Sequence, residues 1–132
     1  MAAIMFPATA AIYCALSVLL VLVLAMRVVT VRRSEQIGIG DDGNRRLARR
    51  IRVHANALEN LPLALLLLVL LEMSGVASAW IHGLGATLLA ARVWHASGLS
   101  ARSGYSLGRF WGTLVTWLLM LGMAGGLLLR SL

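Results

Sequence analysis

Lysine is absent from this 132-residue sequence, and cysteine and acidic residues are scarce. With Cys14 as its single cysteine, the chain can form no internal disulfide and contains no paired-cysteine metal motif. Only five acidic residues stand against twelve arginines, which gives a formal net charge of +7. We therefore predict no metal site, and we expect partners that are anionic.

Hydrophobic residues make up 60% of the chain, and the mean hydropathy is +0.86. Soluble globular domains average about 45–50% apolar residues. Four apolar runs are each long enough for a transmembrane helix of about 20 residues. They cover approximately residues 4–31, 44–74, 79–98 and 107–129. The sequence thus predicts an all-α integral membrane protein with one domain, residues 1–132, folded as a four-transmembrane-helix bundle in a lipid bilayer.

The arginines lie beside the apolar runs. The connection between the first two runs is strongly basic, and Arg102 and Arg109 flank the connection between the last two. The connection between the second and third runs has no basic residue. The positive-inside rule then predicts that both termini lie outside and that both basic loops are cytoplasmic. This pattern favours lipid headgroups or anionic ligands, and not nucleic acid, as partners.

A polar stripe opens the second apolar run. Arg52, Asn56 and Glu59 are spaced i, i+4 and i+7, so they share one helix face, which Arg49 extends. Ionisable side chains inside a membrane span are costly and are therefore candidates for a functional site. The alternative is that Arg52 and Glu59 only pair with each other or with a neighbouring helix. Glu72 ends this run near the opposite interface, where we expect it to be solvated.

A second polar stripe lies at the same end of the predicted bundle. Arg92 and His95 share one face of the third run, and His95 fits either a structural hydrogen bond or a ligand contact. The next connection and the start of the fourth run add Arg102, Tyr105 and Arg109. Both stripes should therefore meet near the cytoplasmic face.

This predicted cluster combines many positive charges with one carboxylate, Glu59. Arginine binds carboxylates through two hydrogen bonds, glutamate accepts from an ammonium group, and asparagine complements an amide. A small peptide with two carboxylates and one amine would match these groups, and glutathione is such a molecule. An adjacent arginine would favour its thiolate form, which could attack lipophilic electrophiles from the bilayer.

Two segments resemble the MAPEG family, the membrane-associated proteins in eicosanoid and glutathione metabolism. The segment similar to the family's second-helix signature is Arg52-x-His54-x-Asn56-x-x-Glu59-x-x-Pro62. The segment that resembles its third helix, especially in the prostaglandin E synthase branch, is Arg92-x-x-His95 followed by Gly98. The resemblance implies a homotrimer of four-helix bundles, with glutathione bound between subunits near the cytoplasmic face.

The resemblance also implies roles for individual residues. By the resemblance, Arg52, Asn56 and Glu59 would bind glutathione, and Arg92 and His95 would line its site. The polar cluster adds Arg49 and Tyr105 as candidate glutathione-binding residues. Arg109 and Arg102 are the candidates for activating the thiol, and Arg109 is preferred because it begins a helix. Leu99 and Asn60 occupy positions where eicosanoid-forming members carry tyrosine, and Tyr105 could replace the missing ring.

These departures argue against an eicosanoid substrate and favour a general electrophile or a peroxide. The short, lysine-free chain resembles the bacterial branch of the family, which implies a bacterial inner membrane. The predicted function is a glutathione-dependent membrane transferase or peroxidase. One alternative is a non-catalytic membrane scaffold or lipid-binding protein with the same fold. A small drug/proton antiporter is disfavoured because the first span has no acidic residue.

Overall fold

Four helices form the fold in the computed structural model, which describes residues 6–101 and 106–132, without the side chains of residues 99 and 101. The helices are α1 (Ala8–Glu35), α2 (Arg45–Met73), α3 (Ser78–Ala101) and α4 (Leu107–Ser131). By length and composition, α1, α2 and α4 could each cross a membrane. The predicted all-α four-helix bundle is confirmed. The predicted start of the first span, residue 4, lies outside the described residues.

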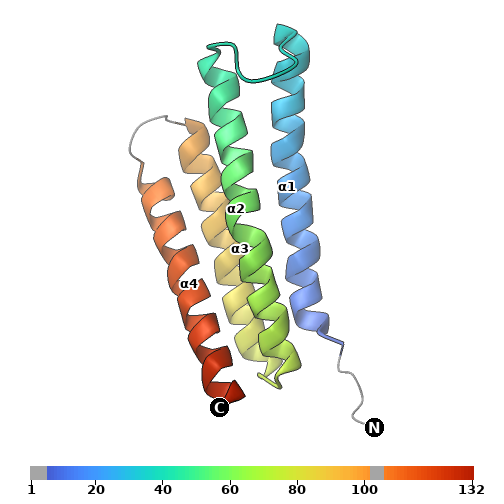
Figure 1. Ribbon diagram of the computed structural model, residues 1–132, viewed down its shortest axis with the longest axis vertical. Helices are drawn as coiled ribbons and strands as arrows, with labels where there is room; N and C mark the ends of the chain where they lie inside the picture. Colours follow the sequence, from blue (N-terminus) through green and yellow to red (C-terminus); the bar gives the residue numbers. More distant parts are fainter. Residues whose placement is uncertain (1–5, 102–105) are drawn as a thin grey trace.

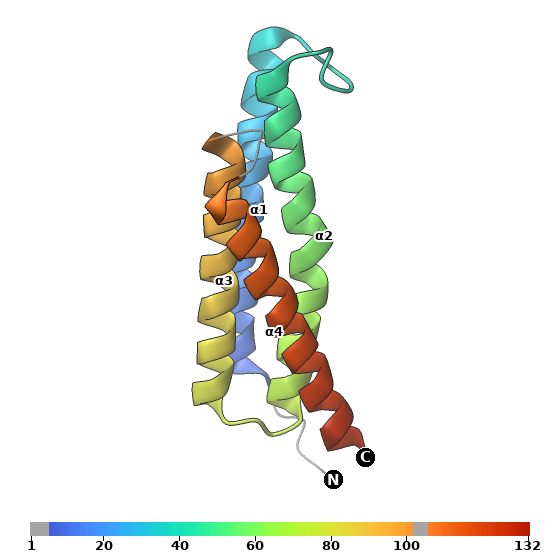
Figure 2. The ribbon, with the colours of Figure 1, turned by 90° about the vertical axis from the view of Figure 1, so that its left-hand side faces the viewer.

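The helices are arranged as two hairpins. Helix α1 packs on α2, α3 packs on α4, and α2 and α3 join the two pairs (Figure 1). At the end that carries the α1–α2 loop, α1 and α2 extend beyond α3 and leave a step (Figures 1 and 2). We call this end the arginine end, because Arg32, Arg33, Arg45 and Arg46 lie there. The α2–α3 turn and the C-terminus lie at the opposite end.

Helices α2 and α3 each contact the other three helices, and α2 carries the polar segment next to the site. The buried apolar residues of α2 recur every three or four positions, as expected for one face of a helix. They are Leu47, Val53, Ala57, Leu61, Ala64, Leu68 and Leu71. This row holds the bundle together and leaves Asn56 at its edge, turned toward α3 and α4.

Side chains fix the starts of α2 and α4. The Asn44 side chain accepts hydrogen bonds from the backbone N–H groups of Arg46 and Leu47, both at 3.0 Å. The Ser106 hydroxyl accepts one from the backbone N–H of Arg109 at 3.3 Å. Such N-caps satisfy donors that the helix itself leaves unpaired. They set the positions from which the arginines of α2 and α4 project.

Helix α1 is capped by a residue from another helix. Both carboxylate oxygens of Glu72, at the end of α2, accept hydrogen bonds from the backbone N–H groups of Thr9 and Ala10, at 3.0 and 2.6 Å. Only 7% of Glu72 is exposed. The expectation that Glu72 is solvated is therefore wrong. The sequence pattern could not reveal this contact, because the partners lie more than 60 positions away in the chain.

Glycines allow α3 and α4 to approach closely. A Cβ atom built on Gly112 would lie 2.7 Å from the Ala91 carbonyl oxygen and from the His95 Cβ. A Cβ on Gly108 would lie 2.7 Å from the Trp94 carbonyl oxygen. Real side chains do not tolerate such distances, so α4 can reach this position only with glycine there.

The Gly112 contact makes a testable prediction. Gly112→Ala should lower the stability of the bundle by about 1–3 kcal/mol through overpacking. Gly122→Ala is the matched control, because Gly122 is also helical and its Cβ would meet nothing within 4 Å. The control should be neutral or gain up to about 1 kcal/mol from helix propensity. Thermal unfolding in detergent, followed by circular dichroism, measures both. Equal shifts for the two variants would refute the packing argument.

The Glu72 cap makes a second prediction. Glu72→Ala removes the acceptors of two buried N–H groups and should lower stability by about 1–3 kcal/mol. Amide hydrogen exchange at Thr9 and Ala10 should accelerate as the first turn of α1 opens. Glu35→Ala, at the exposed end of α1, is the control and should change neither quantity. Unchanged exchange at Thr9 and Ala10 in the Glu72 variant would show that the cap is not needed.

Candidate functional site

Arg92, in the middle of α3, is 1% exposed and is the largest fully buried side chain. Its guanidinium donates hydrogen bonds to the Asn56 Oδ1 on α2 and, at 3.5 Å, to the Thr116 Oγ1 on α4. One side chain thus connects three helices. None of the described carboxylates forms an ion pair with Arg92. A buried charge with only neutral partners is costly, which indicates a role beyond packing.

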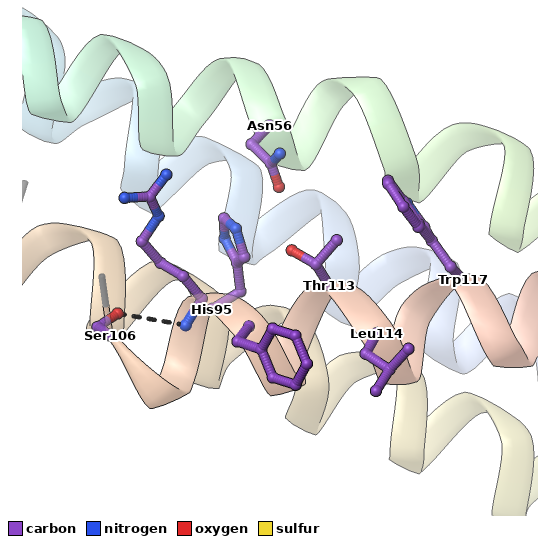
Figure 3. Close-up of a pocket in the computed structure, with 8 residues that line it drawn as sticks. Asn56, His95, Ser106, Thr113, Leu114 and Trp117 are labelled. Atoms are coloured by element: carbon purple, nitrogen blue, oxygen red, sulfur yellow. Dashed lines mark hydrogen bonds between the residues drawn. The ribbon is translucent and has the colours of Figure 1, made fainter. Parts of the chain in front are cut away.

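A cavity of about 440 Å³ lies beside Arg92, between α2, α3 and α4. Figure 3 shows Asn56, His95 and Thr113 turned toward the same space, with Trp117 at one end. The lining residues are Asn56, His95, Ser106, Arg109, Phe110, Thr113, Leu114 and Trp117. The volume falls within the usual range for small-molecule sites, about 300–1,000 Å³.

The cavity has a polar and an apolar part. Asn56, His95 and Arg109 supply an amide, an imidazole and a guanidinium. Phe110 and Trp117 add aromatic surface and are 47% and 60% exposed, so this part opens at the outside of the bundle. A ligand with a charged portion next to an apolar one would be accommodated by such a site.

Two buried nitrogen atoms near the cavity have no hydrogen-bond partner among the described residues: the His95 Nδ1 and the Arg92 Nε. His95 is 3% exposed, and its Cβ packs where Gly112 leaves room on α4. Buried polar atoms are rarely left unpaired, because each unmade hydrogen bond costs about 1–3 kcal/mol. The unpaired imidazole nitrogen, in a residue that lines the cavity, is a group that a bound ligand could satisfy.

A chain of hydrogen bonds fixes the apolar wall. The Trp117 Nε1 donates to the Asn60 Oδ1 at 3.1 Å, and the Asn60 Nδ2 donates to the Asn56 backbone carbonyl at 2.9 Å. The indole on α4 is therefore held against α2 next to the residue that contacts Arg92. In the MAPEG resemblance, Asn60 stands where eicosanoid-forming members carry tyrosine, and in this structure its side chain positions Trp117.

The structure brings together some of the predicted site residues. Asn56 and Arg92 are hydrogen bonded, and Asn56, His95 and Arg109 line one cavity. Arg49 lines a different cavity, with Arg27 of α1. Two further predictions, Arg102 and Tyr105, lie outside the described residues, as does the side chain of Leu99.

Arg52 and Glu59 do not face the cavity. They pair with each other at 3.5 Å on the outer surface of α2, with side chains 60% and 53% exposed. Within one chain, the structure shows the mutual pairing of Arg52 and Glu59 that the sequence left open as an alternative. Their role as glutathione ligands between subunits stays a prediction. Glu59 lies near the middle of α2, about 21 Å from either end at about 1.5 Å per residue. It is therefore deeper in the membrane than the interface.

Helix α4 contributes most of the lining that the sequence did not predict. From the sequence, Trp117 fitted the core, an aromatic belt or a ligand wall, whereas no site role was predicted for Ser106, Phe110, Thr113 and Leu114. Together with Arg109, these five residues recur at i, i+3, i+4, i+7, i+8 and i+11, which is one continuous helix face. The signal was present, but a mixture of apolar and hydroxyl side chains resembles ordinary packing in a membrane helix.

The Arg92–Asn56 contact can be tested by a double-mutant cycle. Arg92→Met and Asn56→Leu should each destabilise the bundle, because each leaves a buried partner unpaired. The double variant should be less destabilised than the sum, with a coupling free energy of about 0.5–3 kcal/mol. Denaturant-free thermal melts in detergent give the comparison. Strict additivity would mean that the hydrogen bond contributes nothing.

Comparison with known proteins agrees with this geometry. The sequence profile of the MAPEG family matches residues 10–129. The inner membrane protein YecN of Escherichia coli K12 is 37% identical over 92 residues, which cover 70% of each chain. YecN of Escherichia coli O6:H1 gives the same values. No solved structure matches significantly. The match over nearly the whole chain shows that this protein belongs to the MAPEG family.

Proposed function

We propose that this protein is a glutathione-dependent membrane transferase or peroxidase that acts on lipophilic electrophiles. The observation that carries the proposal is the cavity between α2, α3 and α4. The polar part of this cavity contains the unpaired buried imidazole nitrogen of His95, and its apolar part opens at the lipid-facing surface. This arrangement matches a reaction between a charged thiol peptide and an apolar substrate.

The side chains in the polar part of the cavity are suited to bind glutathione. Arg109 lines the cavity at the start of α4, where its charge would hold the ligand's sulfur as the thiolate. The Nδ1 of His95 would form a hydrogen bond with a polar ligand group. Glutathione would supply the nucleophile. Arg92 acts indirectly, since it orients Asn56 at the cavity edge.

The outward pair Arg52–Glu59 supports an assembly of several chains. Glu59 lies in the middle of α2, where a charged side chain is unfavourable against lipid, so a polar partner should cover the ion pair that it forms with Arg52. A homotrimer, as the family resemblance implies, would bring a neighbouring subunit to this face of α2. Glutathione bound at that boundary, with its thiol in the cavity of one subunit, would place a carboxylate at Arg52 and its ammonium group at Glu59 on the adjoining α2 surface.

The apolar part of the cavity indicates the chemical class of the second substrate. Phe110, Leu114 and Trp117 offer an apolar surface that an electrophile could reach from the bilayer. The substrate would be a lipophilic molecule with its own electrophilic centre, such as an aryl halide, an activated alkene or a lipid peroxide.

The membrane location and orientation are inferred from the distribution of arginines and from the E. coli relative YecN. We infer an integral inner-membrane location, because the E. coli relative YecN is named an inner membrane protein. The positive-inside rule would place the arginine end in the cytoplasm, where glutathione is available, and both termini outside.

A non-catalytic scaffold of the same fold is the second candidate. The observation that favours it is that Arg52 and Glu59 already neutralise each other. In that case the pair would only stabilise a contact between subunits, and the cavity would hold lipid.

Calorimetry with glutathione distinguishes the two candidates. The purified protein in detergent should bind glutathione, and Glu59→Gln or Arg52→Gln should weaken binding by about 1–3 kcal/mol, as for one charge-assisted hydrogen bond. Arg33→Gln removes a charge at the same end, on exposed α1, and should bind normally. A conjugation assay with a generic aryl halide reports activity. Absence of both heat and conjugation would leave the scaffold.

A further inference from the structure

A second cavity, of about 220 Å³, is lined by residues of α1, α2 and the end of α3. At this end of the bundle, α1 and α2 extend beyond α3 (Figure 2). The second cavity is separate from the cavity that contains His95. The residues that line it are Arg27, Arg46, Arg49, Arg50 and Ser100. Four of these five residues are arginines and none is acidic. They come from three helices, so the cluster depends on the fold and not on a local run of sequence.

Hydrogen bonds hold part of this cluster in place. The Arg27 Nη1 donates to the Ser100 Oγ at 3.2 Å, and the Arg50 Nη1 donates to the Arg27 backbone carbonyl at 2.8 Å. Each guanidinium has five N–H donors, so these bonds use only a small part of the capacity of Arg27 and Arg50. The like charges of Arg27, Arg46 and Arg50 around one small space repel each other, and an anion placed between them would relieve that repulsion.

The depth of the cavity matches the headgroup layer of a bilayer. Arg27 lies about 29 Å along α1 from Ala8, and Arg50 lies about 35 Å along α2 from Met73, at about 1.5 Å per residue. Ser100 lies about 33 Å along α3 from Ser78. The hydrocarbon core of a bilayer is about 30 Å thick. If the opposite ends of the helices mark one boundary, the cavity sits just beyond the other, where lipid phosphates lie.

We propose that the cavity formed by Arg27, Arg46, Arg50 and Ser100 binds a phosphate group. Several guanidinium groups with one hydroxyl donor are the chemistry that recognises phosphate. None of the described residues that line this cavity supplies the amide, imidazole or aromatic groups of the first site, so the described lining favours a compact anion over a peptide. The phosphate can belong to an anionic phospholipid or be free in solution, and both sources supply the same group.

Titration calorimetry in detergent separates the sources. The three probes are dioctanoyl phosphatidylglycerol, inorganic phosphate, and dioctanoylglycerol, which has the same chains without phosphate. The phosphatidylglycerol should bind and the dioctanoylglycerol should not. Arg46→Gln should weaken binding about tenfold, which corresponds to about 1.4 kcal/mol. Arg46 is exposed and its side chain forms none of the bonds that hold the cluster, so this variant should fold.

Arg33→Gln is the matched control, because it removes one charge from the arginine end outside the cavity. Loss of phosphatidylglycerol binding in Arg46→Gln but not in Arg33→Gln supports a lipid source. Equal affinity for inorganic phosphate, with the same dependence on Arg46, supports a free phosphate. Equal weakening by both variants would show only diffuse attraction and would overturn the proposal. So would weaker glutathione binding in Arg46→Gln with phosphate binding unchanged.

Discussion

The buried guanidinium of Arg92 is the constraint on which the rest of the structure depends. Its hydrogen bonds to Asn56 and Thr116 tie α3 to both α2 and α4. Thr116 can reach it only because Gly112, one turn earlier, lets α4 approach α3. The same approach brings the lining face of α4 opposite Asn56 and His95. A charge without a carboxylate partner thus fixes the helix spacing that creates the cavity.

Helix α2 links the inside of the bundle to its outer surface. Asn56 turns inward to Arg92, while Arg52 and Glu59, each about one turn away along the helix, turn outward and pair with each other. All three belong to the segment that resembles the MAPEG second-helix signature. Its conspicuous polarity therefore serves two surfaces, one within the chain and one that a neighbouring chain would complete.

The sequence contained enough information for the four helices, because apolar runs of about 20 residues have few alternatives in a membrane. It also identified Asn56, Arg92, His95 and Arg109 as chemically unusual residues. It could not assign the directions of Arg52 and Glu59, since helical spacing shows which residues share a face but not what that face contacts. Glu72 was misjudged for a similar reason: a carboxylate at a helix end can face water or cap another helix. Such long-range contacts depend on tertiary packing.

The step between the two hairpins explains why the chain can hold two groups of arginines without merging them. Below the step, Arg92 and Arg109 are accompanied by an amide, an imidazole and aromatic rings, so shape and hydrogen-bond pattern constrain what binds. At the step, Arg27, Arg46 and Arg50 line the second cavity together with the Ser100 hydroxyl, so positive charge dominates what binds there. Arg49 lines the cavity at the step and Asn56 lines the cavity that contains His95, so about two turns of α2 separate the two cavities. A ligand bound in the cavity at the step would thus contact α2, the helix that positions Asn56.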